Sequence, residues 1–261
     1  MRLRSGRAAA AIGASLLLLC SPGLASCSFG AQAGAPPVPM PRHPQWQSSA
    51  PLGTWQDAGF DVFNNEWNIA QAGPQRIWAN SFHSWGVESR QPASSSVKTY
   101  PCVQLNYRKP PALTAFARLT STFAESMPAT SASYDAEAAY DIWLNSYKVE
   151  VMIWVANHGR TPAGSVLTHL RIGDREFTVW HDGPNMFSFV LGGQPETSGQ
   201  VNILRFFTWL VSHRFLSKSD TMTQVNFGWE IASTGNAALD FSMQRYSLLS
   251  SYGSAGLRPA L

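Results

Sequence analysis

Carboxylates occupy strand faces in this sequence where charged residues are uncommon, and their placement indicates acid–base chemistry. The stretch 140–154 alternates apolar and polar residues on both sides of Asn145 and Ser146, which predicts a β-hairpin with a two-residue turn. In that register Asp141 lies directly opposite Glu150, with Cβ atoms about 4.5–5.5 Å apart. Two carboxylates this close repel each other, so the pair favours a retained or shared proton.

A second strand with a carboxylate is predicted over 223–231. One face of it is apolar throughout, and Glu230 lies on the other face among polar and small residues. Most glutamates in strands simply face solvent, and this is the alternative for Glu150 and Glu230. Glutamate is nevertheless depleted in strands. The face of Glu150 also carries Met152 and Trp154, which is typical of a groove wall.

The stretch 61–68 could supply groups that bind sugar. As a strand it would present Phe63, Asn65 and Trp67 on one face, so that an amide lies beside an aromatic surface. The pattern equally permits Trp67 in the core and Asn65 in a turn. The chain contains ten Trp but only 13% charged residues. This composition suits stacking of indoles on pyranose rings, although the Trp residues could instead fill a hydrophobic core.

Short apolar runs separated by Gly, Pro, Asn and Ser recur along the chain. Their spacing predicts an all-β protein, a jelly-roll sandwich of two antiparallel sheets. Helical spacing of apolar residues after a Ser-Gly start predicts one amphipathic helix over 198–214, packed outside the sandwich. The predicted strands are 60–69, 76–82, 97–105, 112–120, 132–144, 148–157, 165–172, 175–181, 185–191, 222–233 and 238–248.

The N-terminal part of the chain has the features of an export signal. Three Arg precede a short apolar run, and the sequence Leu-Ala-Ser-Cys ends at Cys27. We therefore expect a lipoprotein-type signal peptide over 1–26, with lipidation of Cys27, or alternatively an ordinary signal cut near Ala25. A Pro- and Gly-rich tether over 27–50 and a folded domain over 51–261 would follow. The protein would be exported, either attached to the cell surface or secreted.

Charge and cysteine content exclude several classes of function. Without the three signal Arg, sixteen basic residues balance sixteen acidic ones, so electrostatics give no support for nucleic-acid binding. Only Cys102 remains in the mature domain, so we expect no intramolecular disulfide. The six His are scattered without the spacing of metal ligands, so we expect no metal and no cofactor.

A set of short motifs, in this order, resembles glycoside hydrolase family 12, whose members are endo-β-1,4-glucanases and xyloglucanases. The resemblance covers about 52–249 and implies the jelly-roll fold of that family, with a curved concave sheet and one outer helix. The motifs are Asn64-Asn65-x-Trp67, Val97-Lys98-x-Tyr100, Tyr140-Asp141-Ile142-Trp143, Glu150-Val151-Met152-Ile153-Trp154 and Phe227-Gly228-x-Glu230.

The resemblance implies a retaining glycosidase. Glu150 matches the nucleophile, Glu230 matches the acid/base, and Asp141 matches a residue that hydrogen-bonds the nucleophile. Retention requires the two catalytic carboxyls to lie about 5–5.5 Å apart. Met152 is expected on the floor of the groove, and Asn65 and Trp67 are expected to contact sugars on the non-reducing side. Further sugar contacts are expected from Trp85, Trp143, Trp154 and Trp180.

The sequence departs from the family pattern around the first Trp and between Asp141 and Glu150, and these departures concern substrate preference. We expect a monomer that hydrolyses internal β-1,4 bonds of a β-glucan and that meets a membrane only through Cys27. Xyloglucan or mixed-linkage β-glucan are alternative substrates. A non-catalytic carbohydrate-binding module is the alternative of another class, and a structural surface lipoprotein would explain the signal but not the groove.

Overall fold

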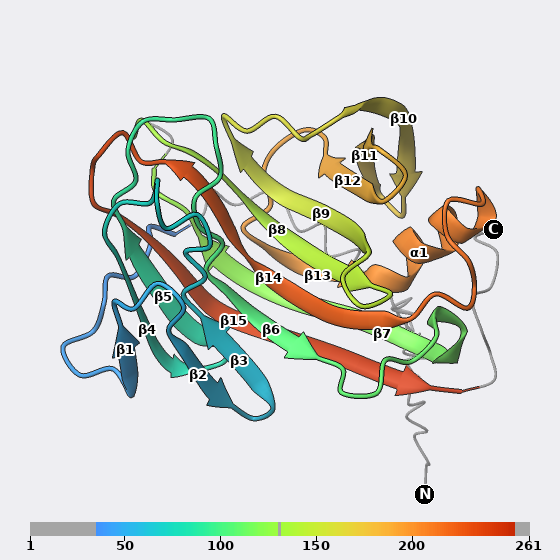
Figure 1. Cartoon of the computed structure of the whole chain (residues 1–261), viewed down its shortest axis with the longest axis horizontal. Helices are drawn as coiled ribbons and strands as arrows, with labels where there is room; N and C mark the ends of the chain where they lie inside the picture. Colours follow the sequence, from blue (N-terminus) through green and yellow to red (C-terminus); the bar gives the residue numbers. More distant parts are fainter. Residues whose placement is uncertain (1–34, 130–131, 254–261) are drawn as a thin grey trace, which may run out of the picture. The chain divides into compact units, whose positions relative to one another are not determined.

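The computed structural model describes residues 35–129 and 132–253, which form two β-sheets packed face to face (Figure 1). One sheet has six strands, in the order β1 (Trp46–Ser48), β4 (Gln75–Ser81), β5 (Ser84–Ser89), β15 (Leu239–Tyr252), β7 (Phe116–Ser126) and β13 (Ser198–Asn202). The other has nine strands, in the order β10 (Ser165–Ile172), β11 (Arg175–Asp182), β12 (Met186–Leu191), β9 (Val149–His158), β8 (Asp135–Leu144), β14 (Met222–Ser233), β6 (Cys102–Asn106), β3 (Phe60–Phe63) and β2 (Thr54–Asp57).

The strands pair antiparallel, except that β12 pairs parallel with β9. A short 3₁₀ turn, Leu113–Ala115, precedes β7. The predicted all-β jelly-roll sandwich is therefore confirmed. Within the described ranges the one α-helix is ten residues long, and no helix there is long and apolar enough to cross a membrane.

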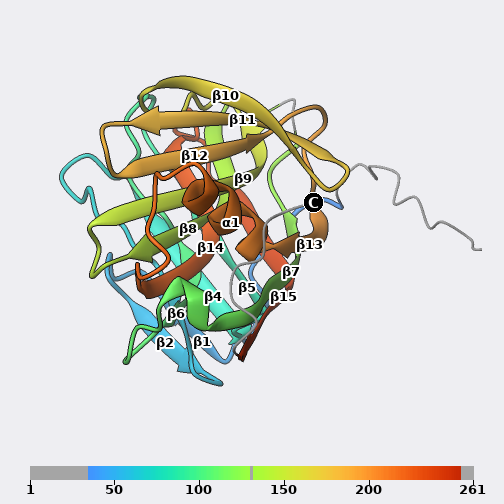
Figure 2. The same ribbon diagram turned by 90° about the vertical axis from the view of Figure 1, so that its right-hand side faces the viewer.

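The helix is shorter than the sequence predicts, because the residues before it form a strand. Residues 198–202 are the edge strand β13, whose Gly199 pairs with Phe123 of β7. The helix α1 spans Ile203–Ser212 and buries Ile203, Phe206, Phe207 and Leu210. Phe206 contacts rings of β11 and β12, beside which α1 lies in Figure 2. The Ser-Gly pair thus begins an edge strand, and the helix begins where buried residues first recur at helical spacing.

Several predicted boundaries are wrong. Trp46–Ser48 lies within the predicted tether but forms β1, paired with β4, so the folded part begins before residue 51. The strand predicted over 60–69 ends at Phe63, and that predicted over 97–105 is regular only from Cys102. The strands β2 and β5 were not predicted, because their short, polar or Gly-containing sequences lack a clear apolar alternation. The predicted cleavage and lipidation sites lie outside the described residues.

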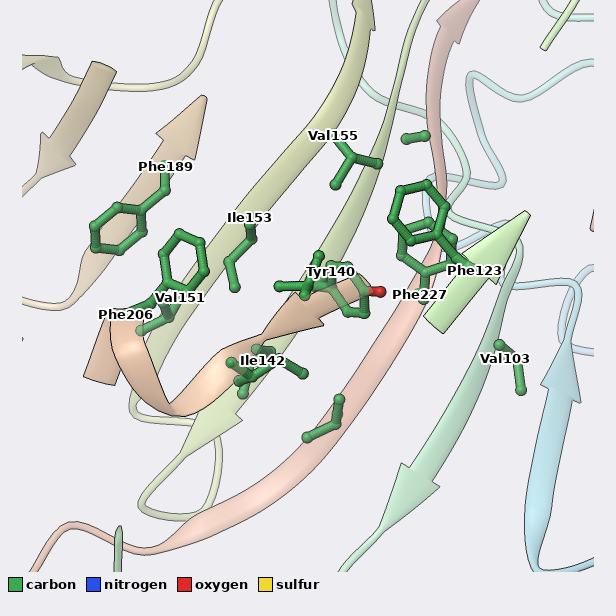
Figure 3. Packing of buried hydrophobic residues seen from close by; sticks show 14 of the residues in the cluster. Val103, Phe123, Tyr140, Ile142, Val151, Ile153, Val155, Phe189, Phe206 and Phe227 are labelled. Atoms are coloured by element: carbon green, nitrogen blue, oxygen red, sulfur yellow. The ribbon is translucent and has the colours of Figure 1, made fainter. Parts of the chain in front are cut away.

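The core between the sheets fixes which faces of β8, β9 and β14 point outward. Tyr140 of β8, Ile153 of β9 and Phe227 of β14 all lie in this core (Figure 3). The rings of Tyr140 and Phe227 are 4.4 Å apart between centroids. Because alternate residues of a strand point to opposite faces, Asp141, Glu150 and Glu230 must lie on the outer face of the nine-stranded sheet.

A buried acid of the six-stranded sheet should make stability depend on pH. Glu125 of β7 accepts a hydrogen bond from Trp229 Nε1 at 2.9 Å, while its Oε1 is buried without a partner. Burial raises the pKa of Glu125 to about 8. The folded state therefore keeps a proton that the unfolded chain releases near pH 4.5. The stabilisation is complete below that pH and is lost as pH rises through about 8.

The substitution Glu125→Gln should therefore weaken this pH dependence. Each pKa unit corresponds to about 1.4 kcal/mol. The difference in Tm between pH 5 and pH 8.5 should shrink by about 5 °C or more, since 1 kcal/mol shifts Tm by about 2–4 °C at this size. Thermal unfolding by calorimetry measures it. The matched control is Glu88→Gln at an exposed position of β5, and an equal pH slope in wild type and Glu125→Gln would refute the assignment.

Candidate active site

The β8–β9 hairpin has a longer turn than predicted, and this changes its register. The turn comprises residues 145–148, so Trp143 lies opposite Glu150 and Asp141 lies opposite Met152. The predicted direct pairing of Asp141 with Glu150 is therefore wrong. The two carboxylates do share one face of the sheet, as predicted, but they are diagonal neighbours. A diagonal pair is still within reach of side-chain interactions.

The turn is built from residues in an unusual backbone conformation. Asn145, Ser146 and Tyr147 have φ values of 52°, 57° and 66°, a left-handed conformation that costs of order 1 kcal/mol or more per non-glycine residue. The Asn145 side chain holds the turn, since its Nδ2 donates to Asp220 Oδ1 at 3.0 Å and its Oδ1 accepts from the Thr221 N–H at 2.9 Å. Such contacts from a distant segment are not visible in the local sequence pattern.

A cleft of about 950 Å³ lies on the outer face of the nine-stranded sheet. All three predicted carboxylates line it, namely Asp141, Glu150 and Glu230. Five of the predicted sugar contacts also line it: Asn65, Trp67, Met152, Trp143 and Trp154.

Two predicted sugar contacts do not line the cleft. Trp85 is fully buried between the sheets, with its ring 4.9 Å from that of Trp229, so its prediction as a substrate contact is wrong. Trp180 of β11 is half-buried and shares a face with Met152 through Ser188, but it is not among the residues lining the cleft.

Aromatic side chains are prominently exposed in the cleft at two places. Trp67 follows β3 in a loop and is 55% exposed. Tyr147, on the β8–β9 turn, is 56% exposed and lies 6.0 Å from the Trp143 ring. Tyr147 was not among the predicted site residues, because a two-residue turn would have ended before it. Exposed rings on both segments can stack on the apolar faces of a polymeric sugar.

The loop that carries Asn65 and Trp67 is held in place by a network of buried hydrogen bonds. Gln75 Nε2 donates to the Asn64 carbonyl at 2.9 Å and to Thr99 Oγ1 at 2.8 Å. The Tyr100 N–H donates to the carbonyl of Asn65 at 3.0 Å. Asn65 has φ of 44° and therefore turns the chain out of the strand. The hydrogen bonds fix Trp67 at the cleft even though 64–68 is not a strand.

Glu150 and Asp141 hold protons more tightly than ordinary carboxyls. Burial, and then the charges of Asp141 and Glu230, raise the pKa of Glu150 to about 8. Burial also raises the pKa of Asp141 to about 7, although hydrogen bonds from Trp143 and Asn226 favour its charged form. The carboxyl of Glu230, from a different strand, thus lies close enough to act on both. Charge on Glu230 therefore opposes the ionisation of both Asp141 and Glu150.

Asp141 lies beside a series of hydrogen-bonded side chains on the cleft face. Trp143 Nε1 donates to Asp141 Oδ2 at 2.8 Å. Asn226 Nδ2 donates to Gln224 Oε1 at 2.8 Å, and Gln224 Nε2 donates to Asn106 Oδ1 at 2.6 Å. These polar residues of β14 and β6 share the cleft face, as the alternation in 223–231 predicts. They provide hydrogen-bonding groups along the floor of the cleft.

The strand that carries Glu230 approaches β6 closely. A Cβ on Gly228 would lie 2.0 Å from the Pro101 carbonyl oxygen, so only glycine fits there. The end of β14 is further held by Lys98, whose buried ammonium donates to the carbonyls of Ala232 and, at 3.2 Å, of Pro92. The motif residues Gly228 and Lys98 therefore position Glu230 rather than touch a substrate.

Two further residues near Glu230 were missed by the sequence analysis. Glu137 of β8 lies directly opposite Glu230 of β14, and Arg160 lines the cleft beside both. Glu137 was detectable, because it lies four residues before Asp141 and period-two alternation puts both on one face. Arg160 follows β9 in a loop, where no periodicity constrains the direction of a side chain.

Comparison with known proteins agrees with this geometry. Endoglucanase S of Pectobacterium parmentieri is 29% identical over 70% of this chain and 80% of its own length. Xyloglucan-specific endo-beta-1,4-glucanase A of Emericella nidulans is 28% identical over 75% of this chain and 90% of its own length. The xyloglucanase domain of NopAA, a type three effector from Sinorhizobium fredii solved with cellobiose, superposes with a TM-score of 0.72 and 26% identity. That match covers 80% of this chain and all of the domain.

The sequence model of glycosyl hydrolase family 12 matches residues 58–248, which include every strand of the cleft floor and all three carboxylates. A match over this much of the chain, together with the jelly-roll fold and the position of the carboxylates, is decisive. The chain belongs to glycosyl hydrolase family 12.

Proposed function

We propose that the protein is an endo-acting, retaining glycosidase that hydrolyses internal β-1,4-glucosidic bonds of β-glucans. The observation that carries this proposal is the group of three interacting carboxyls, Asp141, Glu150 and Glu230, within an open cleft of about 950 Å³. A non-catalytic binding module would have no need for a carboxyl such as Glu150, whose pKa is raised by burial and by two neighbouring carboxyls. An open cleft lets a long chain lie across the site, as cleavage at internal bonds requires.

The proposed mechanism divides the work between the two glutamates. Ionised Glu150 attacks the anomeric carbon, while Glu230 donates its proton to the departing glycosidic oxygen. The resulting glycosyl–Glu150 ester is then hydrolysed by water, whose proton passes to Glu230. Each step inverts the anomeric centre, so the overall result is retention. Asp141 lies on the strand between the two glutamates, where a proton on its carboxyl would relieve the repulsion on ionised Glu150.

Xyloglucan is the second candidate substrate. The Emericella nidulans relative and the Sinorhizobium fredii domain are both named for action on xyloglucan, whereas the Pectobacterium parmentieri relative is named an endoglucanase. The exposed rings of Trp67 and Tyr147 are compatible with either polymer, because an aromatic ring can stack on the glucose units of a branched or an unbranched glucan.

The substrate is tested by incubating the purified protein with carboxymethyl cellulose, xyloglucan and lichenan. We expect reducing ends on at least one polymer, with an early fall in viscosity because internal bonds are cut. Proton NMR of the first products should show the β-anomer before mutarotation. Early appearance of the α-anomer would overturn the assignment of Glu150 as nucleophile. Binding of the polymers without any hydrolysis would favour the carbohydrate-binding module instead.

We further propose that the protein is an exported monomer. The basic, apolar and Leu-Ala-Ser-Cys segments that end at Cys27 support export and lipidation. Export suits an enzyme whose substrate is a polysaccharide too large to enter a cell. Mass spectrometry of the mature N-terminus distinguishes diacylated Cys27 from an ordinary cut near Ala25.

A further inference from the structure

Behind the proposed acid/base lies a third glutamate that the mechanism above does not use. Glu137 of β8 and Glu230 of β14 are direct cross-strand partners, so their side chains project as neighbours from the same face of the sheet. The Glu137 side chain is completely buried, whereas that of Glu230 is 19% exposed toward the cleft. Two neighbouring carboxyl groups can hydrogen-bond to each other only if one of them keeps a proton, since two carboxylates offer only acceptors.

One guanidinium compensates the charge of this pair. Arg160 Nε donates to Glu137 Oε2 at 3.0 Å, and its Nη2 lies 4.0 Å from Glu230 Oε2. Its Nη1 donates to the Ser95 carbonyl at 2.9 Å, which fixes the side chain in place. Arg160 is only 11% exposed. Two acids thus face a single guanidinium, that of Arg160.

Other charged groups around the pair are more distant partners. On β8, Asp135 lies 3.6 Å from Arg160. The charges of Lys98 and His158 act on Asp135, while Asp141, Glu150 and Tyr100 interact with Glu230 from the cleft side. Arg160 itself lies within 4.0 Å of both glutamates.

An ion pair with Arg160 does not account for both oxygens of the Glu137 carboxyl. Arg160 Nε donates to Oε2 only. Glu137 Oε1 is buried and has no hydrogen-bond partner. Burial, followed by the charge and the hydrogen bond of Glu230, raises the pKa of Glu137 well above its usual range, although Arg160 lowers it. The buried oxygen, the cross-strand contact and the single cation all favour one retained proton.

We propose that Glu137 is a positioning residue that shares one proton with Glu230 and thereby keeps the acid/base protonated beside Arg160. The proposal rests on the proposed role of Glu230. Alone, Arg160 would favour ionised Glu230 and so remove the acid before the substrate binds. The negative charge that the pair retains opposes this, while the hydrogen bond fixes the direction of the Glu230 carboxyl.

The pair of glutamates gives up its shared proton in the first step of the reaction and regains a proton in the second. In the first step the shared proton passes from Glu230 to the glycosidic oxygen as the C1–O bond breaks and the bond from C1 to Glu150 forms. The pair is then doubly ionised against Arg160, which makes Glu230 a strong base. In the second step water gives its proton to Glu230 and its oxygen to C1, and the C1–Glu150 bond breaks, so the pair recovers its proton.

The pH dependence of kcat/KM tests this proposal. The fall of kcat/KM at alkaline pH, the alkaline limb of the profile, should report loss of the shared proton. In Glu137→Gln this limb should move down by about 1 pH unit or more, because Glu230 then faces Arg160 without a like charge. In Arg160→Gln the limb should move up, and in the double variant it should return toward wild type. Glu125→Gln, a buried acid of the other sheet, is the control and should leave the limb in place.

Opposite shifts cannot come from a general loss of structure, and Arg160→Gln keeps the test available if Glu137→Gln does not fold. An unchanged limb in both single variants would overturn the proposal. It would mean that Glu137 is neutral and independent, and merely fills its site.

A measurement without substrate separates this inference from the proposed function. Carboxyl ¹³C NMR of protein labelled at Glu Cδ, assigned with Glu137→Gln and Glu230→Gln, follows both groups directly. The two signals should move together through one transition in wild type, and the Glu230 signal should move at lower pH in Glu137→Gln. Separate transitions with the same Glu230 midpoint in both proteins would refute proton sharing. Inactivity on every glucan would instead refute the proposed function and leave this result standing.

Discussion

The substitution Glu150→Gln is expected to lower kcat on the preferred β-glucan by a factor of about 10³ or more, because an amide cannot form the glycosyl ester. The change preserves shape and leaves the N–H of residue 150 free to donate to the Asn185 carbonyl. It also removes a group whose burial raises its pKa to about 8. The folded variant should therefore be at least as stable as wild type at pH 8, so loss of activity would not reflect unfolding.

The measurement is the rate of reducing-end release, with Glu88→Gln as a charge-matched control at an exposed site. A slow 2-deoxy-2-fluoro glycoside with a dinitrophenyl leaving group offers a direct test of the same residue. It should label wild type once, on the peptide that contains Glu150, and should not label the variant. Activity within about tenfold of wild type in Glu150→Gln would exclude this residue as nucleophile.

The second large effect is expected at Glu230, and its size should depend on the leaving group. Glu230→Gln should lower activity on a glucan by about 10²–10⁴, the usual contribution of a general acid and base. With a dinitrophenyl cellobioside, whose departing phenolate needs no proton, formation of the glycosyl ester should stay nearly as fast as in wild type. Hydrolysis of the ester should then be slow, because no base activates water.

Pre-steady-state kinetics resolve these two steps as a burst of dinitrophenol followed by a slow steady rate. Azide, which needs no general base, should restore turnover and give a β-glycosyl azide. An equal loss with both kinds of leaving group, without rescue by azide, would show that Glu230 does not act as the acid/base. Wild-type protein, treated with the same azide, is the control.

The sequence was sufficient to predict which residues share a face, but not which residues are opposite each other. Alternation in 140–144 and 149–154 depends only on the chain's own geometry and correctly placed Asp141 and Glu150 on the cleft face. Their register depended on turn length, which is set by Asn145 through contacts with 220–221. Those contacts join segments 75 or more positions apart, so no local pattern could reveal them.

Strand pairing, which the local sequence does not reveal, also explains the wrong prediction for Trp85. Trp85 and Trp143 are equally good sugar-binding candidates by residue type, yet Trp85 lies in the six-stranded sheet with its ring in the core. Assigning a tryptophan to a cleft requires knowing which sheet its strand joins, and pairing between distant strands is decided by tertiary packing. For Glu230, alternation alone left a solvent-facing glutamate as the alternative. Its assignment came from the family resemblance, in which it occupies a matched position.

The order β9–β8–β14 in the larger sheet bears on when the enzyme becomes active during folding. The strands β8 and β9 are adjacent in sequence and can pair early as a hairpin, at little cost in chain entropy. Glu230 lies 80 positions beyond Glu150, so β14 can dock on β8 only after a long loop has closed. A nascent or partly folded chain would thus present the proposed nucleophile without the proposed acid/base, and hydrolytic competence would arise only once β14 has docked.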